Sequence, residues 1–164
     1  TLFIADSTVI HTPTSEELAD IAIQAANEAR ALGHIPRVAL LSFANFGNPT
    51  MKGTERIHEA IEILNKRKVD FEYDGEMSAD VALNKELLEL YPFSGLSEPA
   101  NILIMPGLHS ANIAAKLLGQ VGGGEVIGPL LTGFSKPIQI MPIGANVSEI
   151  LNYAMFAAHE LKKL

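Results

Sequence analysis

The sequence contains no cysteine. This absence excludes disulfide bonds, thiolate nucleophiles and zinc sites with cysteine ligands. It also fits a reducing compartment, so we expect a cytoplasmic protein. Four of the five histidines fall on predicted loops or polar helix faces and show no metal-binding spacing such as His-x-x-x-His; they are His11, His34, His58 and His159. We therefore expect no metal site in this chain.

Basic residues are also scarce, with 12 Lys and Arg against 19 Asp and Glu and a net charge of −7. Proteins that bind nucleic acid usually carry a basic stripe that neutralises phosphates, and this sequence has none. A small anionic ligand is still compatible with this charge, because one pocket can use backbone amides and a few local cations. No window approaches the 18 apolar residues of a membrane span. We expect neither a nucleic-acid partner nor a membrane.

What is present is a large apolar fraction, 48% of 164 residues. This composition and length predict one compact domain with a sizeable core. The chain begins Thr-Leu-Phe-Ile, inside an apolar run and without an initiator methionine. We expect it to be a piece of a longer protein.

Helical and extended patterns alternate along the chain. Apolar residues at helical spacing predict helices near residues 14–32, 57–64, 78–88, 113–118 and 146–161. Short apolar runs predict strands at 37–43, 71–73, 101–105, 126–127 and 137–141. Alternating elements of this kind indicate a three-layer αβα domain with a largely parallel sheet. Ligands in such folds gather at the carboxyl ends of the strands.

Two helix starts are marked by capping boxes, in which two side chains satisfy free amides of the first turn. The first pairs Thr14 with Glu17, and Gly33 is a plausible cap at the end of that helix. The second pairs Asn146 with Glu149. Glu149 therefore has a structural explanation before any catalytic role is considered.

The first two loops after predicted strands are polar. Residues 42–48, Ser-Phe-Ala-Asn-Phe-Gly-Asn, could present amides to an anion, or could simply form a strand-to-helix turn. The segment does not match a P-loop or a dinucleotide fingerprint. Asp74, Glu76 and Asp80 could hold a metal or act as acid and base. The alternative is a turn whose carboxylates complement the next helix dipole.

The other two loops differ in polarity. In residues 106–112, His109 and Asn112 lie where a ligand at a helix start could be contacted, although His109 has no evident orienting partner and is equally explained as a capping or solvent-facing residue. Residues 141–146, Met-Pro-Ile-Gly-Ala-Asn, are mostly apolar and on their own indicate packing.

In order and spacing, the four loops resemble those of phosphotransacetylases, the phosphate acetyltransferases and related butyryltransferases. Residues 38–43 are similar to the strand that leads into the family's Ser-Phe-Ser-Thr loop. Residues 74–80 resemble its Asp-Gly-Glu-x-x-x-Asp segment, and residues 106–116 its Pro-Asp-Leu-Asn-x-x-Asn-x-x-x-Lys stretch. Residues 128–137 resemble its Gly-Pro-x-x-x-Gly-x-x-Lys-Pro sequence.

This resemblance covers almost the whole chain and implies an isocitrate-dehydrogenase-like αβα subdomain. The family fold has two such subdomains with the acyl-CoA and phosphate site between them, and residues 1–164 resemble only the later half. We expect a single-domain fragment, with the alternative that the last helix, from about residue 146, packs as part of the other subdomain.

The departures from the family predict that the catalytic centre is lost. Pro142, Ile143 and Gly144 stand where the family has Ser-Arg-Gly. Isoleucine cannot make the bidentate pair that arginine makes with phosphate, and losing such a stabiliser costs about a hundredfold in rate or more. Ala44 and Phe46 also replace a hydroxyl and a usually polar or basic residue, and Gly107 replaces an aspartate. We expect no catalytic residue in this chain.

The same departures are similar to the carboxy-terminal domain of large bacterial malic enzymes. That resemblance implies a regulatory, oligomer-building domain that senses acetyl-CoA or a related acyl-CoA or acyl phosphate. NADP and a divalent metal would bind elsewhere in the parent enzyme. The alternatives are an active acyl-CoA:phosphate transferase and a pure scaffold. The residues implied to contact the effector are Ser42, Asn45, Gly47, His109, Asn112, Lys136 and Gly144.

Overall fold

A computed structural model describes residues 1–49, 53–124 and 126–161, and the side chains of residues 160 and 161 lie outside the description. The chain divides into two compact units, residues 1–115 and residues 116–164. Within the described residues, no helix is both long enough and apolar enough to cross a membrane.

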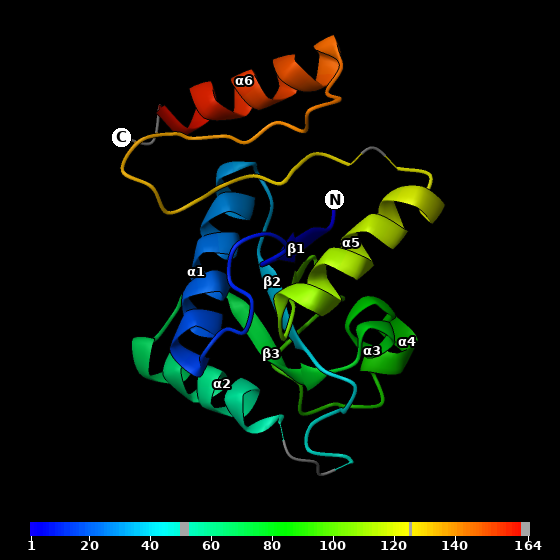
Figure 1. Cartoon of the computed structure of the whole chain (residues 1–164). Helices are drawn as coiled ribbons and strands as arrows, with labels where there is room; N and C mark the ends of the chain where they lie inside the picture. The colour runs from blue at the N-terminus through cyan, green and yellow to red at the C-terminus, as the bar shows by residue number, and fades with distance from the viewer. Residues whose placement is uncertain (50–52, 125, 162–164) are drawn as a thin grey trace. The chain divides into compact units, whose positions relative to one another are not determined.

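The first unit is built on a parallel four-stranded sheet (Figure 1). Its strands are β1 (Phe3–Ala5), β2 (Arg37–Leu41), β3 (Glu72–Met77) and β4 (Ile102–Ile104), in the order β1-β4-β2-β3. β2 is flanked on both sides, and four of its five residues are buried. This burial explains why its sequence is continuously apolar rather than alternating, and it confirms the predicted parallel sheet.

Helices cover both faces of this sheet (Figure 1), which gives the first unit three layers. On one face, α1 (Ser15–Ala31) and α2 (Glu55–Arg67) pack on Val38 and Leu40 of β2. On the other, α3 (Ala79–Leu83), α4 (Lys85–Leu88) and the start of α5 (Leu108–Val121) pack with Ala39 and Leu41. Successive β2 side chains thus enter opposite cores, as the two-residue period of a strand requires.

The predicted start of α1 is confirmed by its hydrogen bonds. The amide of Glu17 donates to the Thr14 hydroxyl at 3.2 Å, and the amide of Thr14 donates to the Glu17 carboxylate at 2.7 Å. The Thr14 amide and, at 2.9 Å, the Thr14 hydroxyl both donate to the Glu17 carboxylate, and they lower its pKa below the ordinary value. Gly33 ends the helix with a φ of +87°, a left-handed conformation that glycine adopts without the steric cost of a side chain.

Two predictions of element extent in the first unit are wrong. The helix expected over 78–88 is divided at Asn84, whose backbone is extended and whose side chain accepts from Glu86 and Leu87 to start α4. Polar side chains of this kind compete with the helix for backbone donors. The loop expected over 106–112 is shorter, because α5 already begins at Leu108.

The second unit contains the end of α5, an extended segment and α6 (Val147–Leu161). The capping box that opens α6 is confirmed: Asn146 and Glu149 exchange bonds of 2.7 and 3.0 Å. The Tyr153 hydroxyl donates to the carbonyl of Gly128, which ties α6 to the extended segment.

The strands predicted at 126–127 and 137–141 are absent from the described structure. A strand needs a neighbouring strand to complete its backbone hydrogen bonds. Here the side-chain amide of Gln139 bonds both the amide and the carbonyl of Leu131, at 3.2 and 3.5 Å, where a backbone ladder would otherwise run. The apolar side chains of these two segments are exposed, including Val126, Ile127, Ile138, Ile140 and Met141.

Candidate functional site

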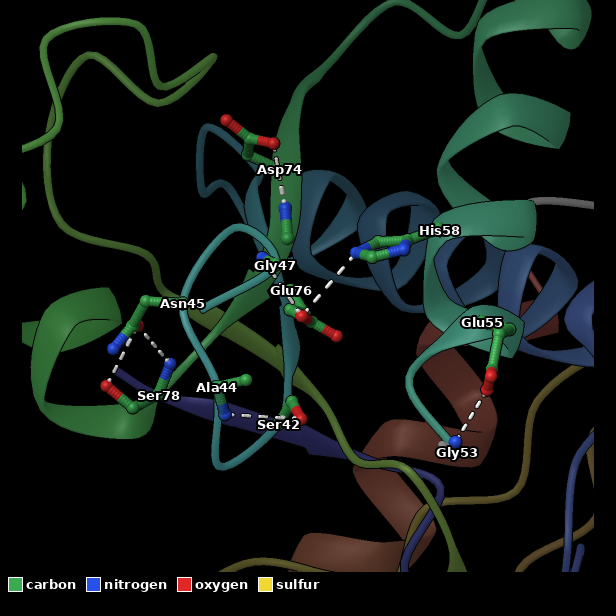
Figure 2. Close-up of polar contacts among 11 residues, drawn as sticks. Ser42, Ala44, Asn45, Gly47, Gly53, Glu55, His58, Asp74, Glu76 and Ser78 are labelled. Carbon is green, nitrogen blue, oxygen red and sulfur yellow. Dashed lines mark hydrogen bonds and ion pairs between the residues drawn. The ribbon is translucent and has the colours of Figure 1, made fainter. Parts of the chain in front are cut away.

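The loop that follows β2, residues 42–48, is fastened to the end of β3. The side-chain oxygen of Asn45 accepts two bonds from Ser78, from its amide at 2.7 Å and from its hydroxyl at 3.0 Å (Figure 2). The amide of Phe46 donates to the carbonyl of Glu76 at 2.8 Å. The loop is therefore held as one unit with the residues that end β3.

Most amides of this loop already have an acceptor within the protein. Their acceptors are backbone carbonyls, the Ser42 hydroxyl at 3.4 Å and the Glu76 carboxylate at 3.1 Å. The donors are Ser42, Ala44, Asn45, Phe46, Gly47 and Asn48. An anion that bound here would have to replace these acceptors, so the loop is not an open cradle of free amides.

A buried carboxylate lies behind the loop. Glu76 has no exposed surface, and its Oε1 accepts from the amide of Gly47 at 3.1 Å and lies 3.5 Å from Nε2 of His58 (Figure 2). Its Oε2 has no hydrogen-bond partner among the described residues. Burying a carboxyl group without hydrogen-bond partners is costly. The bond from the Gly47 amide to Glu76 therefore stabilises the observed position of the loop.

The acidic residues of the second candidate segment do not form one site. Asp74 and Gly75 lie within β3, paired with Ala39 and Leu40 of β2, so their prediction as a loop beyond the strand is wrong. Asp-Gly is a common turn sequence, which explains the error. The Asp74 carboxylate accepts from the amides of Gly75 and Gly95 at 2.8 and 2.6 Å.

Asp80 lies in the first turn of α3, apart from Asp74. The Ser78 hydroxyl and the Val81 amide lower its pKa below the ordinary value, as expected for a carboxylate at a helix start. Within the described part of the chain, no three His, Cys, Asp or Glu side chains are placed to hold a metal ion.

The third candidate segment joins the loop that follows β1. The Asn112 side chain donates to the carbonyl of Ser7 at 3.3 Å, and the amide of Leu108 donates to the carbonyl of His11 at 3.1 Å. His109 is the second residue of α5, and its side chain is exposed. The structure thus brings Asn112 to the carboxyl edge of the sheet but uses its amide group in the fold.

Arg56, in the first turn of α2, was not predicted from the sequence. Its guanidinium donates to the carbonyl of Pro13 at 2.6 Å and to the carbonyl of Pro106 at 3.5 Å. Pro13 ends the loop after β1, and Pro106 follows β4. Nothing in the local sequence signals this reach, because both carbonyls lie more than 40 residues away along the chain.

The remaining predicted residues belong to the second unit. Lys136 and Gly144 are exposed, and the Ile143 side chain next to Gly144 is fully exposed. Glu149 is bound to Asn146 in the α6 capping box. Ser42, Asn45 and Gly47 therefore share one loop, and the assignment of the seven residues to a ligand stays a prediction.

Comparison with known proteins defines the class. A family profile described as phosphate acetyl/butaryl transferase matches residues 1–158. The chain also superimposes on a phosphotransacetylase from Streptococcus pyogenes with a TM-score of 0.93 and 31% identity, over 98% of this chain and 49% of that one. The chain belongs to the phosphate acetyl/butyryl transferase family.

The chain is also similar to two proteins with different names. The chain is 53% identical to the NADP-dependent malic enzyme of Rhizobium meliloti, over 97% of this chain and 21% of that protein. It is 39% identical to the phosphate acetyltransferase of Clostridium acetobutylicum, over 92% of this chain and 46% of that protein. The chain therefore spans about a fifth of the first relative and about half of the second.

Proposed function

We propose that this chain is a non-catalytic regulatory and oligomer-building domain of an NADP-dependent malic enzyme, and that it binds acetyl-CoA or a related acyl-CoA or acyl phosphate. The observation that carries the proposal is the identity to two malic enzymes, 53% and 48%, against 39 to 41% to the phosphate acetyltransferases; three other malic enzymes are 38 to 39% identical. In this proposal, malate, NADP and a divalent metal bind in other parts of the longer protein. The protein works in the cytoplasm.

The local chemistry supports the absence of transferase activity. Ile143 offers no charge where the family places an arginine, and Glu149 is engaged as a helix cap. The loop after β2 directs its amides to protein acceptors rather than to an open anion site. Acyl transfer from a thioester to phosphate develops negative charge on the carbonyl oxygen, and a site without the family's arginine lacks a fixed cation at Ile143 to stabilise that charge.

Regulation requires that the effector bind two quaternary states with different affinities. The second unit supplies surface for such contacts, because its apolar side chains are exposed; among them are Ile138, Ile140, Ile143, Val147 and Leu151. Exposed apolar surface of this extent normally marks an interaction site. In the longer protein we expect residues from about 126 onward to pack with the other half of the phosphotransacetylase-like domain or with a second copy.

The test uses the full-length protein. Titration calorimetry with acetyl-CoA, with light scattering on the same samples, should show saturable binding and a change in assembly. The rate of malate-dependent NADP reduction should change on the same concentration scale. Absence of heat, of any change in assembly and of any rate change would contradict the regulatory role and leave a scaffold.

An active phosphate acetyltransferase is the rival function, favoured by the structural match to the phosphotransacetylase of Streptococcus pyogenes. It predicts phosphate-dependent release of free CoA thiol from acetyl-CoA by the full-length protein. The regulatory proposal predicts no release above background. A turnover that saturates with both acetyl-CoA and phosphate would overturn it.

A further inference from the structure

We infer that Arg56 forms a binding subsite for a phosphoryl group at the carboxyl edge of the sheet. This inference rests on the proposed function and deepens it, because it assigns the phosphate groups of the acyl-CoA effector, rather than the acyl group, to this position. The cation stands on α2, in the first unit.

The guanidinium has donors to spare. An arginine carries five N–H donors in a planar fork. The structure uses one on Nη1, toward the carbonyl of Pro13, and one on Nη2, toward the carbonyl of Pro106. The second bond is long, at 3.5 Å. The two carbonyls therefore orient the fork and leave its other donors for a ligand.

Among the residues that the structure describes, Arg56 has no ion-pair partner, although it is half-buried. No carboxylate in the described part of the chain lies within 4.0 Å of it. The two acids beside it on α2 are directed elsewhere: Glu55 accepts from the amide of Gly53, and Glu59 accepts from the hydroxyl of Ser15, both at 2.5 Å.

Arg67, at the other end of α2, shows the usual arrangement. It pairs with Glu16 and with Asp20, at 2.5 and 2.6 Å, and these partners raise its pKa further above the ordinary value. Half-buried cations normally have such a partner, because removing a charge from water is costly. Arg56 is therefore a half-buried cation with no anionic partner among the described residues, and a bound anion would supply that partner.

The position of the guanidinium selects an anion. Pro13 and Pro106 each lie two residues before a helix, α1 and α5, and both carry their carbonyls to the carboxyl edge of the sheet. The first turn of α5 contains no acidic residue. The first turn of α1 carries two acidic residues, but Glu16 bonds Arg67 and Glu17 bonds Thr14. The unused donors of Arg56 would bind a multiply charged phosphoryl group through bidentate bonds.

The loop after β2 is a poorer place for the same group. Six of its amides already have acceptors, and the buried Glu76 carboxylate lies directly behind Gly47. A phosphate there would have to displace these acceptors and would lie against the buried Glu76 side chain. The two observations together favour Arg56.

The experiment compares four proteins at full length: wild type, Arg56→Gln, Arg56→Lys and the matched control Arg67→Gln. Each is titrated with acetyl-CoA, with S-acetylpantetheine, which lacks phosphates, and with inorganic phosphate, after its thermal unfolding has been recorded. We expect Arg56→Gln to weaken acetyl-CoA binding by about 10- to 100-fold, as for loss of a charge-assisted bond. Arg56→Lys should recover part of that loss, because lysine restores the charge but not the bidentate fork, and Arg67→Gln should bind like wild type.

The arms separate the possible failures. Equal acetyl-CoA affinity in wild type and Arg56→Gln would overturn the Arg56 subsite while the regulatory function stands. Arg56→Gln could lose as much affinity for S-acetylpantetheine as for acetyl-CoA, or Arg56→Lys could recover none of the lost affinity. Either result would show that Arg56 acts only by holding the carbonyls of Pro13 and Pro106 in place. If wild type does not bind acetyl-CoA, the proposed function fails; phosphate binding lost in Arg56→Gln would then still support the subsite, and no phosphate binding would refute both.

Discussion

Replacing Asn45 with alanine should loosen the loop that follows β2. Its side-chain oxygen accepts two bonds from Ser78, and no other side chain in the described part of the chain bonds Ser78 from this loop. Each such bond contributes about 0.5 to 1.5 kcal/mol net, so the substitution should lower the free energy of local opening by about 1 to 3 kcal/mol. The partly buried amide of Ser78 would also be left without its acceptor.

Hydrogen–deuterium exchange of the full-length protein measures this opening directly. The amides of Phe46 and Gly47, which donate to Glu76, should exchange about 5- to 150-fold faster in Asn45→Ala, since 1.4 kcal/mol is a factor of ten. Peptides from α1 should not change, because that helix packs on the opposite face of the sheet.

A double-mutant cycle provides the control. Ser78→Ala removes the hydroxyl bond to Asn45, together with the hydroxyl's interaction with Asp80, and keeps the amide bond; it should accelerate exchange by about 2- to 12-fold. The double mutant should exchange no faster than Asn45→Ala alone, because both bonds end on the same oxygen. An acceleration below twofold in Asn45→Ala, or effects that multiply in the double mutant, would refute this account of the loop.

Three further perturbations test other parts of the structure. Thr14→Ala should lower the free energy of unfolding by about 0.5 to 2 kcal/mol, measured in urea. This difference from wild type should shrink below about pH 4. The reason is that the pKa of Glu17 is lowered in the folded protein, so its contribution is lost as it becomes protonated. Gly75→Ala would place a Cβ 2.6 Å from a backbone oxygen of β2 and should lower thermal stability by about 1 to 3 kcal/mol. Tyr153→Phe removes the bond to the Gly128 carbonyl and should cost about 0.5 to 1.5 kcal/mol, measured by amide exchange in α6.

Each of these has a clear contrary result. A Thr14→Ala effect that grows at acid pH would mean that Glu17 does not act through its ionised form. For glycine, Gly124 is the matched control, because a Cβ there would meet no atom within 4 Å, so equal losses at both positions would remove the steric argument. Unchanged exchange in α6 of Tyr153→Phe would show that the hydroxyl does not hold that helix.

The parts of the fold that local sequence determines were predictable. The capping boxes at Thr14 and Asn146 need only residues three positions apart, and both are formed. The run over 37–43 predicted a strand buried on both faces, and β2 is one. Such signals depend on periodicity and on short-range hydrogen bonds, which the sequence shows directly.

What the sequence could not show depends on distant partners. The segment at 137–141 has the composition of a strand, but no neighbouring backbone pairs with it in the described structure. Asp74 has the composition of a turn, but it pairs with Ala39 and lies within β3. The candidate site shows the same limit: the reach of Arg56 to Pro106 and the position of Glu76 behind Gly47 arise from tertiary packing alone.

The order of the strands also constrains how this chain is made. β1 pairs only with β4 within the described sheet, although about 100 residues separate them in the sequence. At typical rates of synthesis, the first strand waits roughly 5 to 20 s on the ribosome before its partner exists. During that interval only the β2–β3 pair has both its strands, and β4 then enters between β1 and β2. Completion of the first unit is therefore a late event in translation, and a chain that stops before residue 102 cannot close its sheet.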